Sequence, residues 1–130
     1  MDKIDILMAT YNGEKFLKEQ IDSILNQTYS DFRLIISDDC SKDNTREILK
    51  EYEKKDERIK VYFQENNLGY VKNFEFLLTK VENDIYMLSD QDDVWLSTKV
   101  EHTYNKLKET NSDLVFTDLE VVDEKLNILY

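Results

Sequence analysis

The sequence predicts an α/β domain in which a mostly parallel sheet is covered by helices on both faces. Short apolar segments alternate along the chain with longer segments of helical period, and glycine and proline contribute only 2 and 0 residues. Such an alternation of strand and helix favours a parallel sheet that is buried on both sides. The 130 residues, of which 41% are hydrophobic, suffice for one domain over residues 1–130 with a substantial core.

Four short segments are predicted to be strands because they are apolar and rich in β-branched or aromatic residues. They cover residues 4–9, 32–37, 59–63 and 84–89. A weaker fifth candidate covers residues 114–117. Because chain-breaking residues are so few, we expect Asn- and Asp-rich turns to join the strands to the helices.

Helical period predicts four helices, at residues 14–27, 43–55, 70–81 and 97–110. In the first helix the apolar side chains share one face, formed by Phe16, Leu17, Ile21, Ile24 and Leu25. Capping groups precede two of the other helices. Ser97 or Thr98 is expected to cap the fourth, and residues 41–44 offer capping groups to the second.

The charge balance of the chain restricts its ligands. With 17 basic and 28 acidic side chains the net charge is −11. This argues against nucleic acid as a partner, because nucleic-acid binding depends on Lys and Arg contacts to phosphate. An anionic ligand would need a divalent cation to mediate its binding; otherwise the charge simply keeps a small domain soluble. The single cysteine, Cys40, excludes an internal disulfide.

Membrane and secretion signals are absent from the sequence. No apolar run approaches the ~18–20 residues of a membrane span, and the N-terminus lacks the basic start and apolar core of a signal peptide. We therefore expect a cytoplasmic protein, which could work at the inner face of a membrane through parts outside this chain. Residues 119–130 look like the start of a strand–turn–strand unit, so a longer protein is expected.

Polar residues follow three of the predicted strands at the points where they end. Residues 10–14 follow the first strand, Asp38 and Asp39 follow the second, and residues 90–93 (DQDD) follow the fourth. Ligands of parallel sheets bind beyond the carboxyl ends of the strands, near a topological switch point. The three loops are therefore expected to converge and to gather up to five carboxylates. Oxygen ligands in that number suit Mg²⁺ or Mn²⁺, which keep positions open for substrate phosphates.

Several of these residues have structural alternatives. Asp38, Ser41 and Asp43 can serve only as turn and capping residues, and Tyr11 can be a space-filling aromatic. A merely solvated turn at residues 90–93 is less expected, because three carboxylates in four residues exceed what a turn requires.

Other polar residues have less certain roles. Lys72 and Asn73 either solvate the start of a helix or contact a ligand. His102 lies in a polar helix and is interpreted as a surface residue, and Cys40 as structural because no His or second Cys is near it in the sequence.

Together these segments resemble the inverting family-2 glycosyltransferases, whose GT-A fold is a Rossmann-like α/β sheet. The resemblance runs from residue 4 to about residue 123. It rests on TYNG at 10–13, SILNQTYSDFRLIISDDCSKDNT at 23–45, NNLGYVKNF at 66–74 and LSDQDDVW at 88–95. Each motif alone is a weak signal, but their order and spacing are specific. The resemblance implies a GT-A sheet truncated after its donor-binding half.

The resemblance also implies a nucleotide-sugar ligand and assigns residues to it. Asp39 corresponds to the residue that accepts a hydrogen bond from the base, with Tyr11 stacking on the base. A carboxylate can accept the imide N–H of uracil or thymine, which neither purines nor cytosine offer in that pattern. The implied nucleotide-binding residues are Thr10, Tyr11, Asn12, Glu14, Asp38, Asp39, Lys72, Asp90, Gln91 and Asp92, and the implied metal ligands are Asp92 and Asp93.

The implied reaction is a single displacement that inverts the anomeric carbon. In the family the carboxylate base lies well beyond the acidic loop. Asp118 and Asp123 come too early to match it, so no catalytic residue is assigned. The acceptor is expected to be a glycan or a lipid-linked saccharide, in capsule or other surface polysaccharide synthesis. DQDDVW resembles the rhamnosyltransferase-like variant, which uses dTDP-rhamnose; other members with similar loops use UDP sugars.

One residue departs from the family pattern. The position after Asp38-Asp39 is often Gly or Asn, and here it is Cys40. If the turn needs a positive φ at this position, Cys40 would be strained.

Two other classes of α/β protein compete with this hypothesis. A non-catalytic receiver-like signalling module also has an acidic metal pocket, but it needs an Asp after its third strand and a Lys after its fifth. Here the third strand is followed by Gln64 and Glu65, and the fifth by Asp118. A dinucleotide-binding Rossmann domain needs GxGxxG after its first strand, which this sequence lacks.

Overall fold

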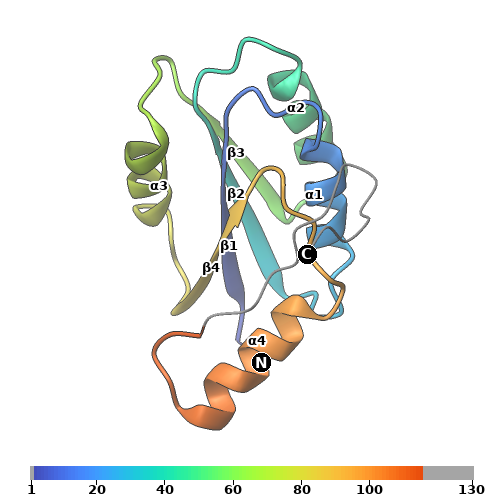
Figure 1. Cartoon of the computed structure of the whole chain (residues 1–130), viewed down its shortest axis with the longest axis vertical. Helices are drawn as coiled ribbons and strands as arrows, with labels where there is room; N and C mark the ends of the chain where they lie inside the picture. The colour runs from blue at the N-terminus through green and yellow to red at the C-terminus, as the bar shows by residue number, and fades with distance from the viewer. Residues whose placement is uncertain (1, 116–130) are drawn as a thin grey trace, which may run out of the picture.

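The computed structural model describes residues 2–115, and its centre is a four-stranded sheet (Figure 1). The strands are β1 (Ile4–Thr10), β2 (Phe32–Asp38), β3 (Ile59–Phe63) and β4 (Ile85–Asp90). They pair in the order β3-β2-β1-β4, and every pairing is parallel. The four predicted strands are thus confirmed to within a residue at each end. Of the fifth candidate, Leu114 and Val115 are not in a strand, and residues 116–117 lie outside the described residues.

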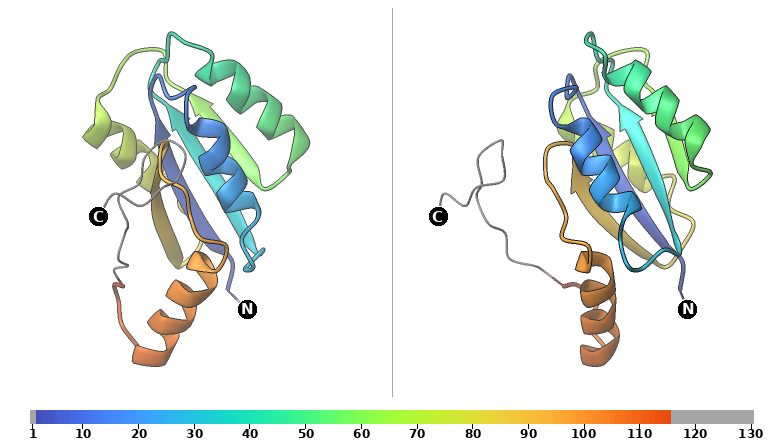
Figure 2. Two further views of the ribbon diagram at one scale, coloured as in Figure 1. Left: turned by 45° about the vertical axis from the view of Figure 1, so that its right-hand side comes forward. Right: turned by 90° about the vertical axis from the view of Figure 1, so that its right-hand side faces the viewer.

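Helices cover both faces of the sheet, as predicted. They are α1 (Leu17–Leu25), α2 (Thr45–Lys55), α3 (Tyr70–Leu78) and α4 (Lys99–Thr110). Figures 1 and 2 show α1 and α2 on one face, α3 on the other, and α4 beyond the amino ends of the strands. None of the helices in the described part of the chain is long and apolar enough to cross a membrane.

Alternating side chains of the strands build a separate core on each face of the sheet. Ile4, Ile6 and Met8 of β1 join the larger core under α1 and α2, whereas Leu7 joins the smaller core under α3. Strand geometry explains this split, because successive side chains point to opposite faces. Such strands read as continuous apolar runs, which is how the sequence revealed them.

The sheet order creates a topological switch point between β1 and β4. The chain builds β1, β2 and β3 in one direction and then returns past β1 to place β4. Because crossovers are right-handed, this reversal puts α3 on the opposite face from α1 and α2. At the carboxyl ends of the strands, the chain after β1 leads to α1 on one face and the chain after β3 leads to α3 on the other, and ligands of open sheets bind at such a point.

The turn after β2 has the strained residue that the sequence analysis anticipated. Cys40 has φ 61°, in the left-handed region, which costs a non-glycine residue about 1–2 kcal/mol. Its thiol lies 3.5 Å from the Glu65 carbonyl oxygen and 3.5 Å from Lys42 Nζ. The turn therefore does require a positive φ at this position.

Replacing Cys40 with asparagine is expected to raise the free energy of unfolding by up to about 1 kcal/mol, because asparagine tolerates this conformation better. Urea denaturation measures the difference. Cys40→Ser is the matched control, since serine removes the thiol but keeps the strained φ and should give no gain. Equal stabilisation by Ser and Asn would show that the thiol, not the backbone, is the cause.

Candidate functional site

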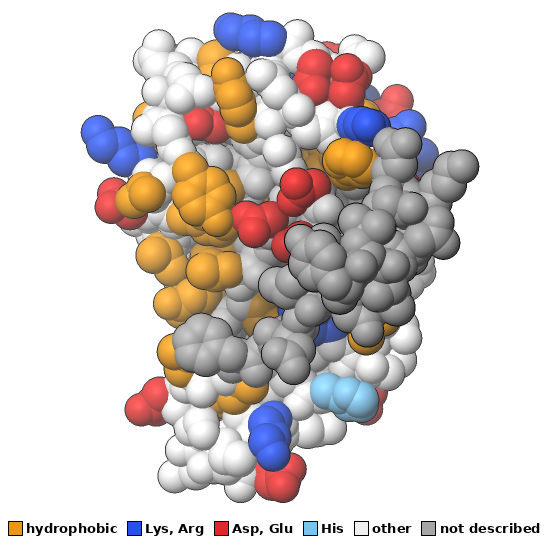
Figure 3. Space-filling view, viewed as in Figure 1, with side chains coloured by type: hydrophobic (Ala, Val, Ile, Leu, Met, Phe, Trp, Pro, Cys, Tyr) orange, Lys and Arg blue, Asp and Glu red, His pale blue; other side chains and the backbone are white. Residues whose placement is uncertain are grey.

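An open cavity of about 470 Å³ lies at the switch point. The loops after β1, β2 and β4 and the connection from β3 to α3 form its walls. Its lining residues are Ala9, Thr10, Tyr11, Asp39, Asn67, Gly69, Tyr70, Asn73, Asp90, Gln91 and Asp92. Figure 3 shows acidic side chains gathered near the middle of this side of the molecule, beside apolar side chains. Thr10, Tyr11, Asp39, Asp90, Gln91 and Asp92 were singled out from the sequence; Asn12, Glu14, Asp38, Lys72 and Asp93 do not line the cavity.

Asp39 connects β2 to the start of α3. Its carboxylate is only 4% exposed and accepts hydrogen bonds from the backbone N–H groups of Leu68 (2.6 Å) and Gly69 (2.9 Å). Gly69 has φ 87°, a conformation that glycine adopts without strain. A carboxylate offers about four acceptor positions. Asp39 therefore keeps acceptor capacity for a group that enters the cavity.

Tyr70, the first residue of α3, reaches across the cavity to β4. Its hydroxyl donates to Asp90 Oδ1 (3.0 Å), and its ring meets the edge of Phe74 at a centroid distance of 5.0 Å. Partial burial, together with the hydrogen bond to Asp90, raises the pKa of the Tyr70 phenol. The phenol therefore stays protonated and keeps donating to Asp90 at neutral pH.

Asn73 lines the cavity, whereas the predicted contact Lys72 does not. Asn73 is 1% exposed and exchanges two hydrogen bonds with Ser37 of β2. Lys72 is exposed on the outside of α3. The helical period indicates which of the two side chains is buried, because Asn73 and the buried Leu77 are four residues apart and share a face. Asn67, Gly69 and Tyr70 were also missed, although NNLGYVKNF contains them.

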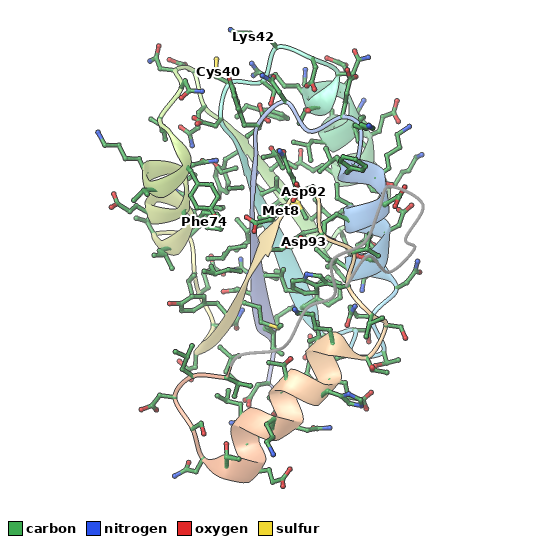
Figure 4. All side chains as sticks on the ribbon, in the orientation of Figure 1. Met8, Cys40, Lys42, Phe74, Asp92 and Asp93 are labelled. Carbon is green, nitrogen blue, oxygen red and sulfur yellow. The ribbon has the colours of Figure 1, made fainter. Side chains whose placement is uncertain are left out.

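The acidic loop, residues 90–93, carries negative charge that nothing in it neutralises. Partial burial first, and then the charges of Asp90 and Asp92, raise the pKa of the Asp93 carboxyl. In Figure 4, Asp92 and Asp93 lie where β4 ends. Two or three hard oxygen donors with surplus charge fit Mg²⁺ or Mn²⁺, which bind through one or two carboxylates plus substrate phosphates.

The three loops converge on the cavity as predicted, but of their acidic residues only Asp39, Asp90 and Asp92 line it. Within residues 2–115 no group of three or more His, Cys, Asp or Glu side chains is arranged to hold a metal ion. One reason is that Asp38 turns away from the cavity. It is fully buried and accepts hydrogen bonds from Thr10 Oγ1 (2.8 Å), Ser41 Oγ (2.6 Å) and the Ser41 N–H (3.0 Å). Asp38 therefore has the turn-forming role that the sequence allowed as the alternative to ligand binding.

Asn12 and Glu14 also bond to the protein itself. Asn12 Oδ1 accepts the N–H of Lys42 (2.8 Å), and Glu14 Oε2 accepts the N–H of Asn44 (3.3 Å). In return, Asp43 accepts the N–H of Glu14 (3.2 Å) and that of Thr45 (2.9 Å), so it forms a turn just before α2. These bonds join the loop after β1, which carries Tyr11, to the loop after β2.

A polar stripe that runs from α1 into the residues after it, and that was not predicted, binds the end of β4 and the segment beyond it. Gln20 donates to Ser89, the Trp95 N–H donates to Ser23 (3.0 Å), and Gln27 bonds to both Leu96 and Val100. Gln20, Ser23 and Gln27 occur at i, i+3 and i+7, beside the apolar stripe. This spacing was the available signal.

Comparison with known proteins places the chain among glycosyltransferases. The profile described as Glycosyl transferase family 2 matches residues 5–128. The putative teichuronic acid biosynthesis glycosyltransferase TuaG of Bacillus subtilis (strain 168) is 32% identical over 114 residues, 88% of this chain and 45% of TuaG. The O-antigen biosynthesis glycosyltransferase WbnJ of Escherichia coli is 35% identical over 128 residues, 95% of this chain and 49% of WbnJ. The chain thus spans about half the length of these relatives.

A solved structure with the same fold supports this placement. The crystal structure of S. aureus TarS 1-349 in complex with UDP matches with a TM-score of 0.77 and 29% sequence identity. The match covers 85% of this chain and 33% of the TarS chain. TarS 1-349 in complex with UDP-GlcNAc matches with a TM-score of 0.78. The predicted GT-A fold is thereby confirmed.

Proposed function

The chain belongs to glycosyl transferase family 2, and we propose that its cavity binds a pyrimidine nucleotide-diphosphate sugar whose sugar the protein transfers to an acceptor. One observation carries this proposal. A buried carboxylate, Asp39, and an exposed aromatic ring, Tyr11, line the same cavity as the carboxylates Asp90 and Asp92. A nucleoside diphosphate has a matching pair of ends, a flat base with an N–H donor and a diphosphate that binds cations.

The base is proposed to bind between Tyr11 and Asp39. The ring of Tyr11 is 48% exposed and can stack on a base. The acceptor capacity that Asp39 retains suits the imide N–H of uracil or thymine. Thr10, Asn12, Glu14 and Asp38 support this end by holding the loops, and exposed Lys72 stays a prediction for a direct contact.

The diphosphate is proposed to bind at the acidic loop, with Asp92 and Asp93 holding Mn²⁺ or Mg²⁺. When bound, the cation neutralises the diphosphate and stabilises it as a leaving group. Tyr70 keeps Asp90 in place through its hydroxyl. Partial burial, and then the charges of Asp90 and Asp92, raise the pKa of Asp93, and this supports the assignment because a bound cation would favour the charged carboxylate.

The proposed reaction is an inverting displacement. An acceptor hydroxyl attacks the anomeric carbon while the bond to the nucleoside diphosphate breaks, and a carboxylate base takes the proton of the hydroxyl. No described residue is assigned as that base, and Asp118 and Asp123 lie outside the described residues. TarS binds UDP and UDP-GlcNAc, which favours a UDP sugar over dTDP-rhamnose as the donor.

The biological setting follows from the relatives as a proposal. TuaG and WbnJ are named for teichuronic acid and O-antigen biosynthesis. We therefore propose a glycan or lipid-linked saccharide as the acceptor and surface polysaccharide synthesis, in the cytoplasm at the inner face of the membrane, as the process. The receiver-like alternative is disfavoured by the sheet order β3-β2-β1-β4, since receiver domains have the order 2-1-3-4-5.

Nucleotide titration followed by thermal unfolding tests the proposal. UDP or dTDP with Mn²⁺ is expected to raise the melting temperature, by the equivalent of about 2.7 kcal/mol when the ligand is at 100 times its Kd. CDP is the matched control, because it carries the same diphosphate but its base lacks the imide N–H. Equal responses to CDP and UDP would overturn the base assignment. No response to any pyrimidine diphosphate would overturn the proposed function.

A further inference from the structure

The side chain of Gln91 binds both backbone groups of one residue in the neighbouring loop. Its Oε1 accepts the N–H of Tyr11 (2.8 Å), and its Nε2 donates to the C=O of Tyr11 (2.9 Å). The last pairing between β1 and β4 joins Ala9 to Asp90. The carboxamide of Gln91 therefore continues the hydrogen bonding between β1 and β4 one step beyond the ends of the two strands.

Gly13 supplies an independent sign that this position of the carboxamide is built into the fold. A Cβ at residue 13 would lie 2.2 Å from Gln91 Oε1 and 2.5 Å from Gln91 Cδ. Gly13 is not among the residues with positive φ, so its backbone conformation alone does not demand glycine. A side chain at residue 13 would instead displace the Gln91 carboxamide from the Tyr11 backbone.

The two residues that Gln91 joins lie at opposite ends of the proposed ligand. Tyr11 belongs to the base end, and Gln91 lies between Asp90 and Asp92 at the diphosphate end. With both polar atoms of its amide engaged, Gln91 has only residual capacity to contact a nucleotide directly. This differs from the nucleotide-binding role that the sequence alone suggested for it.

We propose that Gln91 is a positioning residue that sets the spacing between the base end and the metal end of the cavity. This inference rests on the proposed function. A ligand held at two ends gains affinity only when both ends are engaged together, and that gain depends on their spacing. Gln91, with the space left by Gly13, makes Mn²⁺ and the nucleotide reinforce each other's binding.

The test measures the Kd of UDP with and without Mn²⁺ by calorimetry, in the whole chain. The ratio of interest is the Kd without Mn²⁺ divided by the Kd with Mn²⁺. In Gln91→Ala this ratio is expected to fall about tenfold or more, because the metal end no longer aligns with the base end. Gly13→Ala should cause a similar fall, since its Cβ displaces the carboxamide. In the Gln91→Ala background, Gly13→Ala should have no further effect, because the clashing group is gone.

Other outcomes overturn the inference in distinct ways. If Gln91 contacts the nucleotide directly, Gln91→Ala should weaken UDP binding equally with and without Mn²⁺ and leave the ratio of the Kd values unchanged. A purely structural role would lower the melting temperature without changing the ratio. Additive effects of the two substitutions would show that Gly13 and Gln91 act separately. If the unsubstituted protein binds no UDP under either condition, the proposed function itself fails.

Discussion

Replacing Asp93 with asparagine is expected to abolish the Mn²⁺-dependent part of UDP binding while it raises the melting temperature of the ligand-free protein. Partial burial and the neighbouring charges of Asp90 and Asp92 disfavour the Asp93 carboxylate and raise its pKa. Asparagine has the same shape without the charge, so the repulsion disappears. As a metal ligand it is far weaker, and we expect the Mn²⁺-dependent gain in affinity to fall by about 100-fold or more.

The pH dependence of this stabilisation has a definite sign. Because the folded-state pKa of Asp93 lies above its unfolded value of about 3.8, the folded protein binds the proton more tightly. As the pH rises through the unfolded and then the folded pKa of Asp93, the unsubstituted protein therefore loses stability relative to Asp93→Asn. Above the folded pKa it stays less stable than the variant. The advantage of Asp93→Asn should be complete at pH 7 and should shrink towards pH 4 in thermal unfolding.

Asp113→Asn is the matched control, since Asp113 is exposed and away from the acidic loop in the sequence. It makes the same change in net charge but should neither stabilise the protein nor alter its response to Mn²⁺. An Asp93→Asn protein that keeps its Mn²⁺ response would remove Asp93 from the metal site. If Asp93→Asn lost its response to Mn²⁺ without any rise in melting temperature, the proposed repulsion of Asp93 by its neighbouring carboxylates would be refuted.

Replacing Asp5 with alanine is expected to destabilise the fold by about 3–5 kcal/mol, the cost of breaking a buried ion pair from one side. Asp5 is fully buried at the amino end of β1. Its carboxylate accepts hydrogen bonds from Arg33 Nε (2.8 Å), from the N–H of Glu82 (2.8 Å) and from two groups of Asn83. It therefore joins β1, β2 and the segment that leads into β4, and so aligns the strands that carry the cavity.

Urea denaturation measures this loss, which is a large part of the roughly 5–15 kcal/mol that stabilises a typical domain. Asp31→Ala is the control: Asp31 also pairs with a cation, Lys3, but at 3.9 Å with both side chains about half exposed. An exposed pair of this kind contributes about 0–1 kcal/mol. If Asp5→Ala cost no more than Asp31→Ala, the buried network would not stabilise the fold.

The same network predicts acid sensitivity. Burial alone would raise the pKa of Asp5, but the hydrogen bonds from Arg33, Glu82 and Asn83 outweigh it and lower the pKa to about 2. Because the folded pKa is depressed, the stabilisation is present above the unfolded value of about 3.8 and is lost as the pH falls through about 2. Asp5→Asn should lack this loss of stability between pH 4 and pH 2.

The fold could be predicted from the sequence because its signals are local. Strand 59–63 was located without error, and the other elements to within a few residues, since apolar runs and helical period lie within each segment. The start of α1 was predicted three residues too early. Glu14 bonds instead to Asp43 and Asn44 in the loop after β2, and the Phe16 N–H bonds to the Gly13 carbonyl in a turn before the helix.

Two adjacent acidic residues show what could not be predicted from neighbouring residues alone. Asp38 and Asp39 follow the same strand, and the sequence offered both as ligand contacts. In the structure Asp38 is fully buried and accepts three hydrogen bonds from Thr10 and Ser41, whereas Asp39 lines the cavity. Alternation along an extended chain says that the two side chains point in opposite directions, but it does not say which direction leads to the cavity.

By itself, the sequence determined the parallel α/β sheet, the loops that meet at its rim and the acidic loop after β4, because periodicity and strand ends are properties of neighbouring residues. Only the tertiary structure decided which polar atoms stay available to a ligand. That depends on partners far apart in the chain: the Tyr11 backbone that engages Gln91 is 80 residues away, and the Gln20 side chain that bonds to Ser89 is 69 residues away. A hydrogen-bonding group is free or occupied only with respect to such partners.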